Sequence, residues 1–211
     1  MNEQLIKFLR AIDLDDALNL RGQIGTVSPQ DSEEISKILT EWHPPQAVAN
    51  LLLHSALISD RVRFSALMRG LDGYKGSYFR LAAVVGLQSL KSFNDEERQT
   101  VLGRLTDIIQ QDFDTIAQRA SVSIDRYIGD DDLVGLFALL NHANPTVRHN
   151  ILNTLIRHIG MEDFDMFMKP RVQENGLEPE IQQYIADHFQ KAARGQLYSY
   201  IPNLIDWHTD E

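Results

Sequence analysis

The sequence predicts an all-α protein, built as a right-handed α-α superhelix, or solenoid, of about five to six stacked helix pairs. Apolar residues recur at spacings of three and four, as in Ile151, Leu152, Leu155, Ile156 and Ile159, which is the pattern of one helix face. No stretch shows the alternation or the β-branched clustering of a strand. Breakers and capping residues divide the chain into short segments, some of which resemble one another.

Each helix is delimited by capping residues and breakers. Asp31-Ser32 is expected to cap one helix, and Asn144-Pro145 opens a late helix that ends at Gly160. Proline needs no N–H partner at the first position of a helix, and the Asn144 side chain can cap the same helix. The expected helices span residues 3–12, 14–24, 32–43, 45–58, 60–72, 77–92, 95–110, 113–128, 131–142, 145–159, 162–174 and 179–194.

Two of these segments are similar to each other. IAQRASVSIDRYIG, which ends at Gly129, and VRHNILNTLIRHIG, which ends at Gly160, both place an arginine early and an aliphatic seam behind it. YFRLAAVVGLQSL, which begins at Tyr78, has the same early arginine and a seam of small residues. The two glycines and the early arginines repeat at different intervals, so the period is irregular, as in a solenoid of imperfect repeats.

Residues 133–160, LVGLFALLNHANPTVRHNILNTLIRHIG, resemble a HEAT repeat: a first helix ending in Leu-Leu, a polar turn with Asn-Pro, and a second helix ending in Ile-Gly. Residues 60–129 resemble it more loosely. The resemblance to the HEAT/armadillo-like family implies that second helices line the concave side of a solenoid. Small residues on one second helix, Ala82, Ala83 and Gly86, are expected to let neighbouring pairs approach closely.

Composition is that of an ordinary globular protein, with 211 residues, 43% of them hydrophobic and 24% charged. We expect one domain, with N-terminal cap helices in residues 1–30, stacked pairs in 31–195 and a capping tail in 196–211. The first thirty residues lack the apolar run of a secretory signal, so the mature chain is expected to begin at Met1. No apolar stretch is long enough for a membrane span, and the chain has no cysteine, which fits the cytoplasm.

The formal net charge of -10 argues against a generic nucleic-acid binder, because duplex affinity comes mainly from Lys and Arg. Only residues 59–92, the basic band, reverse this balance, with six Lys/Arg against two Asp/Glu. Arginine and aromatic residues are enriched where protein interfaces concentrate their energy. The candidate partner-binding residues in the band are Arg61, Arg63, Arg69, Tyr74, Lys75, Tyr78 and Arg80. A solvated helix with intramolecular ion pairs explains the same residues.

The early arginines of the three similar segments are further candidates. Arg80, Arg119 and Arg148 form a ladder on the concave face of the expected solenoid and join the partner-binding set. In solenoids such residues also pair with acidic groups of the adjoining repeat, so the alternative is a structural role.

The sequence offers no site for chemistry. His142, His149 and His158 are spaced so that the last two lie on opposite helix faces, and neither a metal nor a cofactor is expected. The acid run Asp130 to Asp132 lacks the spacing of a calcium loop and is expected to cap the helix starting near Leu133. Gly-rich phosphate loops and a G-x-S-x-G elbow are absent, so we expect no catalytic residues.

These observations favour a non-catalytic scaffold that binds a protein partner. One alternative is an enzyme that resembles the alkylpurine DNA glycosylases built from HEAT-like repeats, although those use a basic groove with Trp and Asp at the lesion. Another is an acidic inhibitor or immunity protein that masks a basic partner. The apolar tail, Tyr198 to Trp207, is expected to cap the last repeat; self-association through it is the alternative.

Overall fold

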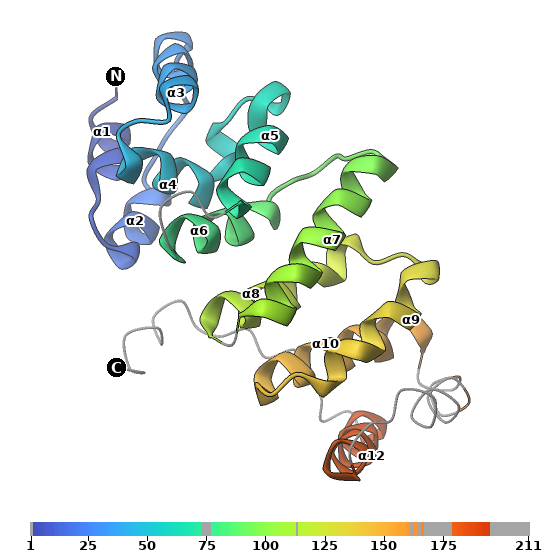
Figure 1. Cartoon of the computed structure of the whole chain (residues 1–211). Helices are drawn as coiled ribbons and strands as arrows, with labels where there is room; N and C mark the ends of the chain where they lie inside the picture. Colours follow the sequence, from blue (N-terminus) through green and yellow to red (C-terminus); the bar gives the residue numbers. More distant parts are fainter. Residues whose placement is uncertain are drawn as a thin grey trace. The chain divides into compact units, whose positions relative to one another are not determined.

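The computed structural model describes residues 2–72, 77–112, 114–160, 163, 166 and 179–194, and in these residues the chain is helical with no strand (Figure 1). The prediction of an all-α protein is therefore confirmed. The described residues form two compact units, one up to Arg98 and the other from Gln99 onward. The single domain with its cap helices and stacked pairs stays a prediction.

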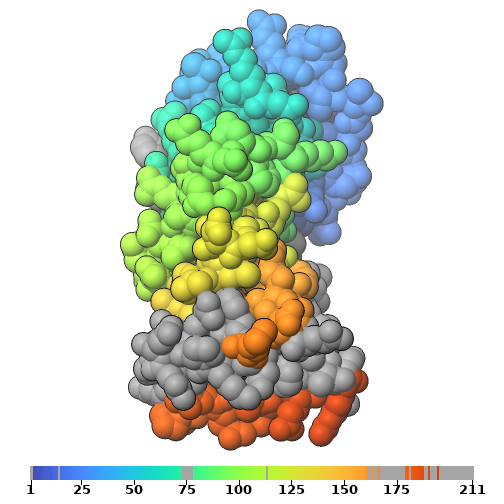
Figure 2. Space-filling model, turned by 90° about the vertical axis from the view of Figure 1, so that its right-hand side faces the viewer, coloured from blue at the N-terminus to red at the C-terminus, as the bar shows by residue number. Residues whose placement is uncertain are grey.

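The first unit contains six helices and the start of a seventh. They are α1 (Glu3–Arg10), α2 (Leu14–Arg21), α3 (Pro29–Glu41), α4 (Pro45–Leu53), α5 (Asp60–Leu71) and α6 (Ser77–Leu87), with a 3-10 turn, η1 (Ser55–Leu57), before α5 and the first turn of α7 (Asp95–Gln111) at the end. Side chains fill the spaces between the ribbons (Figure 2).

The second unit holds the rest of α7, then α8 (Thr115–Ser123), α10 (Pro145–Ile159) and α12 (Pro179–Ala193). Between α8 and α10 the chain runs through η2 (Ile124–Tyr127), η3 (Asp130–Asp132), a four-residue α-helix α9 (Leu133–Leu136) and η4 (Phe137–Asn141). Nearly all of the expected helix 162–174, and all of the tail 196–211, lie outside the described residues.

Helix α4 is the core of the first unit. Every residue from Ala47 to Leu53 is buried, which is the pattern of a helix surrounded by others. It packs against α1, α3, α5 and α6. Its one polar residue in that stretch, Asn50, is fully buried and donates from Nδ2 to the Phe8 and Ala11 carbonyls at 2.8 and 3.0 Å. These carbonyls lie at the C-terminal end of α1, where the Phe8 carbonyl also accepts from the Ala11 N–H at 3.2 Å, so Asn50 completes the capping of this helix end.

Alternate helices pack on one another in both units. In the first unit α4 packs against α6, and in the second α8 packs against α10. A β-carbon added to Gly86 on α6 would lie 2.2 Å from the Leu52 carbonyl oxygen on α4. Ala82 and Ala83 are buried beside it. Helices α4 and α6 therefore approach closely at these small residues; that they belong to neighbouring pairs of a solenoid stays a prediction.

Several predicted helix ends are confirmed. The Asn144 side chain accepts from the Thr146 N–H at 2.9 Å, with Pro145 as the first residue of α10. Gly160 ends that helix at a φ of 82°, which is in the left-handed region that favours glycine.

Several predicted elements need correction. The expected helix 77–92 ends at Leu87, and the expected helix 113–128 is an α-helix only over Thr115–Ser123 and continues as a 3-10 segment. Helix α3 begins at Pro29, not at residue 32, because Ser28 is the N-cap and Asp31 completes a capping box with it. The expected helix 45–58 ends at Leu53 and continues as a 3-10 turn. The expected helix 131–142 is mostly 3-10, and the Asp132 carboxylate accepts from the Gly129 N–H at 2.9 Å. The acid run thus caps its own short turn.

Candidate partner-binding site

The basic band begins at the N-terminal end of α5, where its arginines have different surroundings. Arg61 is exposed. Arg69 is exposed too, and its guanidinium lies 4.2 Å from the centre of the Trp42 ring, a cation–π contact within the first unit. Side chains two positions apart on a helix point in different directions, so Arg61 and Arg63 do not share a face. Tyr74 and Lys75 lie outside the described residues.

Arg63 points inward and joins α5 to the turn before it. Its Nε donates to the Ser55 carbonyl at 2.8 Å and its Nη2 to the Ile58 carbonyl at 2.6 Å. Its Nη1 lies 2.6 Å from the Asp60 carboxylate. Only 13% of the Arg63 side chain is exposed, against 85% for Asp60. The guanidinium therefore holds the 3-10 turn η1 against α5.

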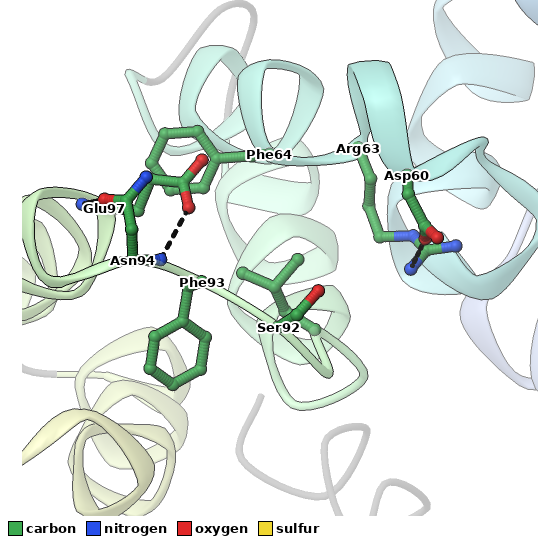
Figure 3. Close-up of a pocket in the computed structure, with 8 residues that line it drawn as sticks. Asp60, Arg63, Phe64, Ser92, Phe93, Asn94 and Glu97 are labelled. Carbon is green, nitrogen blue, oxygen red and sulfur yellow. Dashed lines mark hydrogen bonds and ion pairs between the residues drawn. The ribbon is translucent and has the colours of Figure 1, made fainter.

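A pocket of about 330 Å³ opens beside this arginine, within the first unit (Figure 3). One wall comes from the first turns of α5 and the other from the segment between α6 and α7. Glu97 and Phe64 lie at one end of the pocket, and Arg63 with Asp60 at the other. The lining residues are Asp60, Arg63, Phe64, Leu90, Ser92, Phe93, Asn94 and Glu97.

The far wall is fixed by a capping box at the start of α7. The Glu97 carboxylate accepts from the Asn94 N–H at 2.9 Å, and the Asn94 side chain accepts from the Glu97 N–H at 2.9 Å. This reciprocal pair sets the direction in which the chain enters the helix. Phe93, immediately before the cap, is thereby held at the pocket and is partly exposed, as Phe64 is.

The pocket combines apolar surface with an acidic rim. Phe64, Leu90 and Phe93 supply the apolar surface. Two carboxylates line the pocket against one guanidinium, and that guanidinium is largely buried. A pocket of this size is at the lower end of the range of about 300–1,000 Å³ for ligand sites. It can therefore take one or two side chains of a partner.

Tyr78, another predicted contact residue, has a structural role. Its hydroxyl donates to the Asn50 Oδ1 at 3.0 Å, which links α6 to the central helix. Burial raises the pKa of Tyr78 to about 12, and the nearby charge of Asp13 acts in the same direction, while a hydrogen bond with Gln46 lowers it. The phenol is half-buried and is hydrogen-bonded to the core of the first unit.

We expect the folded chain to lose stability at high pH through this tyrosine. The pKa of Tyr78 is raised from 10.0 to about 12, so its stabilising effect is fully present below pH 10 and is lost as the pH rises through 12. Burial raises the pKa of Tyr127 to about 12 as well. Burial raises the pKa of Tyr184 too, so an absorbance titration near 295 nm should show at least three of the six tyrosines ionising late, and Tyr78→Phe should remove one of them. Complete ionisation near pH 10 with native circular dichroism would contradict this.

The three early arginines do not form one exposed ladder. Arg119 is only 3% exposed, inside the second unit. Arg148 donates from Nη1 to the His142 and Ala143 carbonyls at 2.7 and 2.9 Å, and its guanidinium lies 5.8 Å from the centre of the Tyr184 ring. Arg80, in the first unit, is partly exposed. Arg148 thus contacts backbone carbonyls close to it in the chain and Arg119 is buried, and a role of the three arginines in partner binding stays a prediction.

A second hollow of about 310 Å³ lies between α1, α3 and the start of α4. Its floor is apolar, but its rim balances two acidic and two basic residues, with one histidine. It is lined by Ile6, Leu9, Arg10, Glu34, Lys37, Ile38, Glu41, His43, Pro44 and Ala47. Because these charges offset one another, this hollow indicates no partner of particular charge.

Two features are absent from the part of the chain that the structure describes. No group of three or more His, Asp or Glu side chains there is placed to hold a metal ion. No helix there is both long and apolar enough to cross a bilayer.

Sequence reasoning missed Phe64, Phe93 and Glu97. The spacing of Asn94 and Glu97 is a capping-box signature, and it could have placed Phe93 at the entrance of a helix. Nothing in the sequence places that entrance beside the first turn of α5, because the approach is tertiary.

Comparison with known proteins gives no match: neither a protein-family model, nor a curated protein, nor a solved structure is similar to this chain.

Proposed function

We propose that this protein is a binding module that holds a protein partner on a solenoid of HEAT/armadillo-like helix pairs and performs no chemistry on it. The observation that supports it best is the packing of α4 on α6 and of α8 on α10. If α3 with α4, α5 with α6, α7 with α8 and α9 with α10 are the successive pairs, these contacts join second helix to second helix. Such contacts between neighbours are what a solenoid needs to bury its core.

The pocket beside Arg63 is the contact site that we propose. It lies where the basic band meets the acidic start of α7, and it offers two partly exposed phenylalanines among charged residues. Aromatic anchors in a pocket surrounded by polar groups are typical of the centres of protein interfaces. Arg61 and Arg69, exposed on the same helix, are the proposed surrounding contacts.

We expect a bulky residue in the pocket to abolish partner capture. Ser92 is exposed and lines the pocket, so Ser92→Trp fills it without deleting a core side chain. Ser65 is exposed on α5 and is not part of the pocket lining, so Ser65→Trp is a matched control. Affinity capture from native lysate should recover a partner with the wild type and with Ser65→Trp, and lose it with Ser92→Trp. Equal recovery with both variants would remove the pocket from the interface.

The net charge of -10 favours one more specific role, an acidic inhibitor or immunity protein that masks a basic partner. Charge complementarity accelerates association and sets partner choice, and it weakens as salt is added. A complex whose affinity falls with salt favours the inhibitor over a scaffold held by apolar contacts.

A further inference from the structure

We propose that the pocket beside Arg63 receives an arginine or lysine side chain of a protein partner. This inference rests on the proposed binding function and specifies the chemistry of the residue that enters the pocket. Three features of the pocket lead to it: its apolar surface, the charge at its rim, and the hydrogen bonds that Arg63 already makes.

The apolar surface fits the stem of a long basic side chain. Phe64 projects from α5, and Leu90 and Phe93 come from the segment that leads to α7. Lysine and arginine bury their methylene stems on apolar surface while the charged group stays at the water boundary. An aromatic ring also attracts a cation placed over its face. A pocket that holds one or two side chains suits such a residue.

Among the residues that line this pocket, the charge that reaches solvent is negative, although the exposed Arg61 and Lys91 are next to lining residues in the sequence. The Asp60 side chain is 85% exposed, whereas that of Arg63 is 13% exposed. Glu97 lines the other end, and its carboxylate makes one hydrogen bond with the Asn94 N–H, which leaves further acceptor positions. The exposed Asp95 and Glu96 belong to the same first turn of α7. A cationic group at the mouth therefore meets carboxylates at both ends.

An anionic residue is disfavoured by the same geometry. Arg63 is the one cation among the lining residues, and its Nε, Nη1 and Nη2 already contact the Ser55 and Ile58 carbonyls and the Asp60 carboxylate. A partner carboxylate would have to approach Asp60 and Glu97 to reach it. Like charges placed close together at an interface cost binding energy and exclude the wrong partner.

The test uses three acetylated and amidated pentapeptides, Gly-Ala-X-Ala-Gly, in which X is arginine, norleucine or glutamate. Each is titrated into the ¹⁵N-labelled full-length chain at low salt. We expect the arginine peptide to shift the amide resonances of Asp60, Phe64 and Ser92 to Glu97. The norleucine peptide, which keeps the stem without the charge, should bind more weakly, and the glutamate peptide should leave these resonances unchanged.

Two variants measure the contribution of each carboxylate. Glu97→Gln keeps an acceptor for the capping box and removes the charge, and Asp60→Asn removes the other charge. Each variant should weaken binding of the arginine peptide about two- to fivefold, as expected for the loss of an exposed ion pair of up to about 1 kcal/mol. Glu33→Gln, an exposed acid elsewhere on the first unit, should change nothing. In the absence of peptide, the resonances of residues outside the pocket should be unshifted in Asp60→Asn and Glu97→Gln, which checks that both variants are folded.

The outcomes separate this inference from the proposed function. Norleucine or glutamate peptides that bind as tightly as the arginine peptide overturn the preference for a cation. The preference is also overturned if the arginine peptide leaves the pocket resonances unshifted. The same holds if the arginine peptide binds both carboxylate variants as tightly as it binds Glu33→Gln. The proposed function is decided separately by the Ser92→Trp and Ser65→Trp captures, which do not depend on the charge of the entering residue.

Discussion

Gly86→Ala is expected to destabilise the first unit by about 3 kcal/mol or more, because the added methyl group overpacks a rigid contact. The new β-carbon would lie 2.2 Å from the Leu52 carbonyl oxygen and 2.7 Å from a methyl of Leu67. The oxygen belongs to the backbone of α4, so relief of the clash requires α4 and α6 to move apart. Urea unfolding followed by circular dichroism at 222 nm measures the loss as a lower midpoint.

Two other glycines provide controls for this experiment. Gly103 is exposed on α7 and a β-carbon there meets nothing within 4 Å, so Gly103→Ala should stabilise the chain by about 0.5–1 kcal/mol through helix propensity. At Gly70 the nearest atoms are a Leu52 methyl at 2.7 Å and the Ala83 β-carbon at 2.9 Å. The Leu52 methyl can rotate away, whereas the Ala83 β-carbon is fixed to the backbone of α6. Because these contacts are longer than the 2.2 Å contact at Gly86, Gly70→Ala should still be destabilising but should cost less than Gly86→Ala. A Gly86→Ala midpoint equal to that of Gly103→Ala would refute the close approach.

The helices themselves could be predicted because their signals are local. Asn144 caps α10 and Gly160 ends it, and both can be identified from a few neighbouring residues. Where two local signals compete, the choice depends on contacts that are not local. Asp31-Ser32 resembles a cap, but Ser28 before Pro29 forms the better one, and the Asn2 N–H donates to Asp31 from another helix at 3.0 Å. The error in α3 has that origin.

The candidate site could be predicted only in part, because a sequence shows which residues are charged but not in which direction their side chains point. The basic band identified α5 as the helix of interest. Whether an arginine on it faces solvent depends on the 3-10 turn at Ser55 to Leu57, whose carbonyl acceptors lie within reach of Arg63 and not of Arg61. In the second unit Arg119 is buried, and Arg148 donates to two backbone carbonyls. Arginines that are equivalent in the sequence pattern thus have different roles.

Asn50→Ala is expected to destabilise the first unit by about 3 kcal/mol, because it leaves the buried Ala11 carbonyl without its donor and removes two further hydrogen bonds. The Asn50 side chain connects three helices, with α1 reached through the Phe8 and Ala11 carbonyls and α6 through the Tyr78 hydroxyl. Leaving a buried polar group unsatisfied costs about 1–3 kcal/mol. The Phe8 carbonyl still accepts from the Ala11 N–H, so the lost bonds to Phe8 and Tyr78 add a smaller amount. Asn50→Asp should be as harmful, because an ionised carboxylate has no N–H to donate to the two carbonyls.

Asn150 in α10 is the matched control in the second unit. It is also buried, but its Nδ2 donates at 3.0 Å to the Ser121 hydroxyl, which keeps its own hydrogen bond to the Gln118 carbonyl at 2.7 Å when Asn150 is removed, and it reaches that carbonyl itself only at 3.5 Å. Asn150→Ala should therefore cost about 1 kcal/mol, near the average for one hydrogen bond. A double-mutant cycle of Asn50→Ala with Tyr78→Phe completes the test. Because the two residues share a hydrogen bond, Tyr78→Phe should lower the free energy of unfolding by less in the Asn50→Ala background than in the wild type. An equal decrease in both backgrounds would show that the network does not act as a unit.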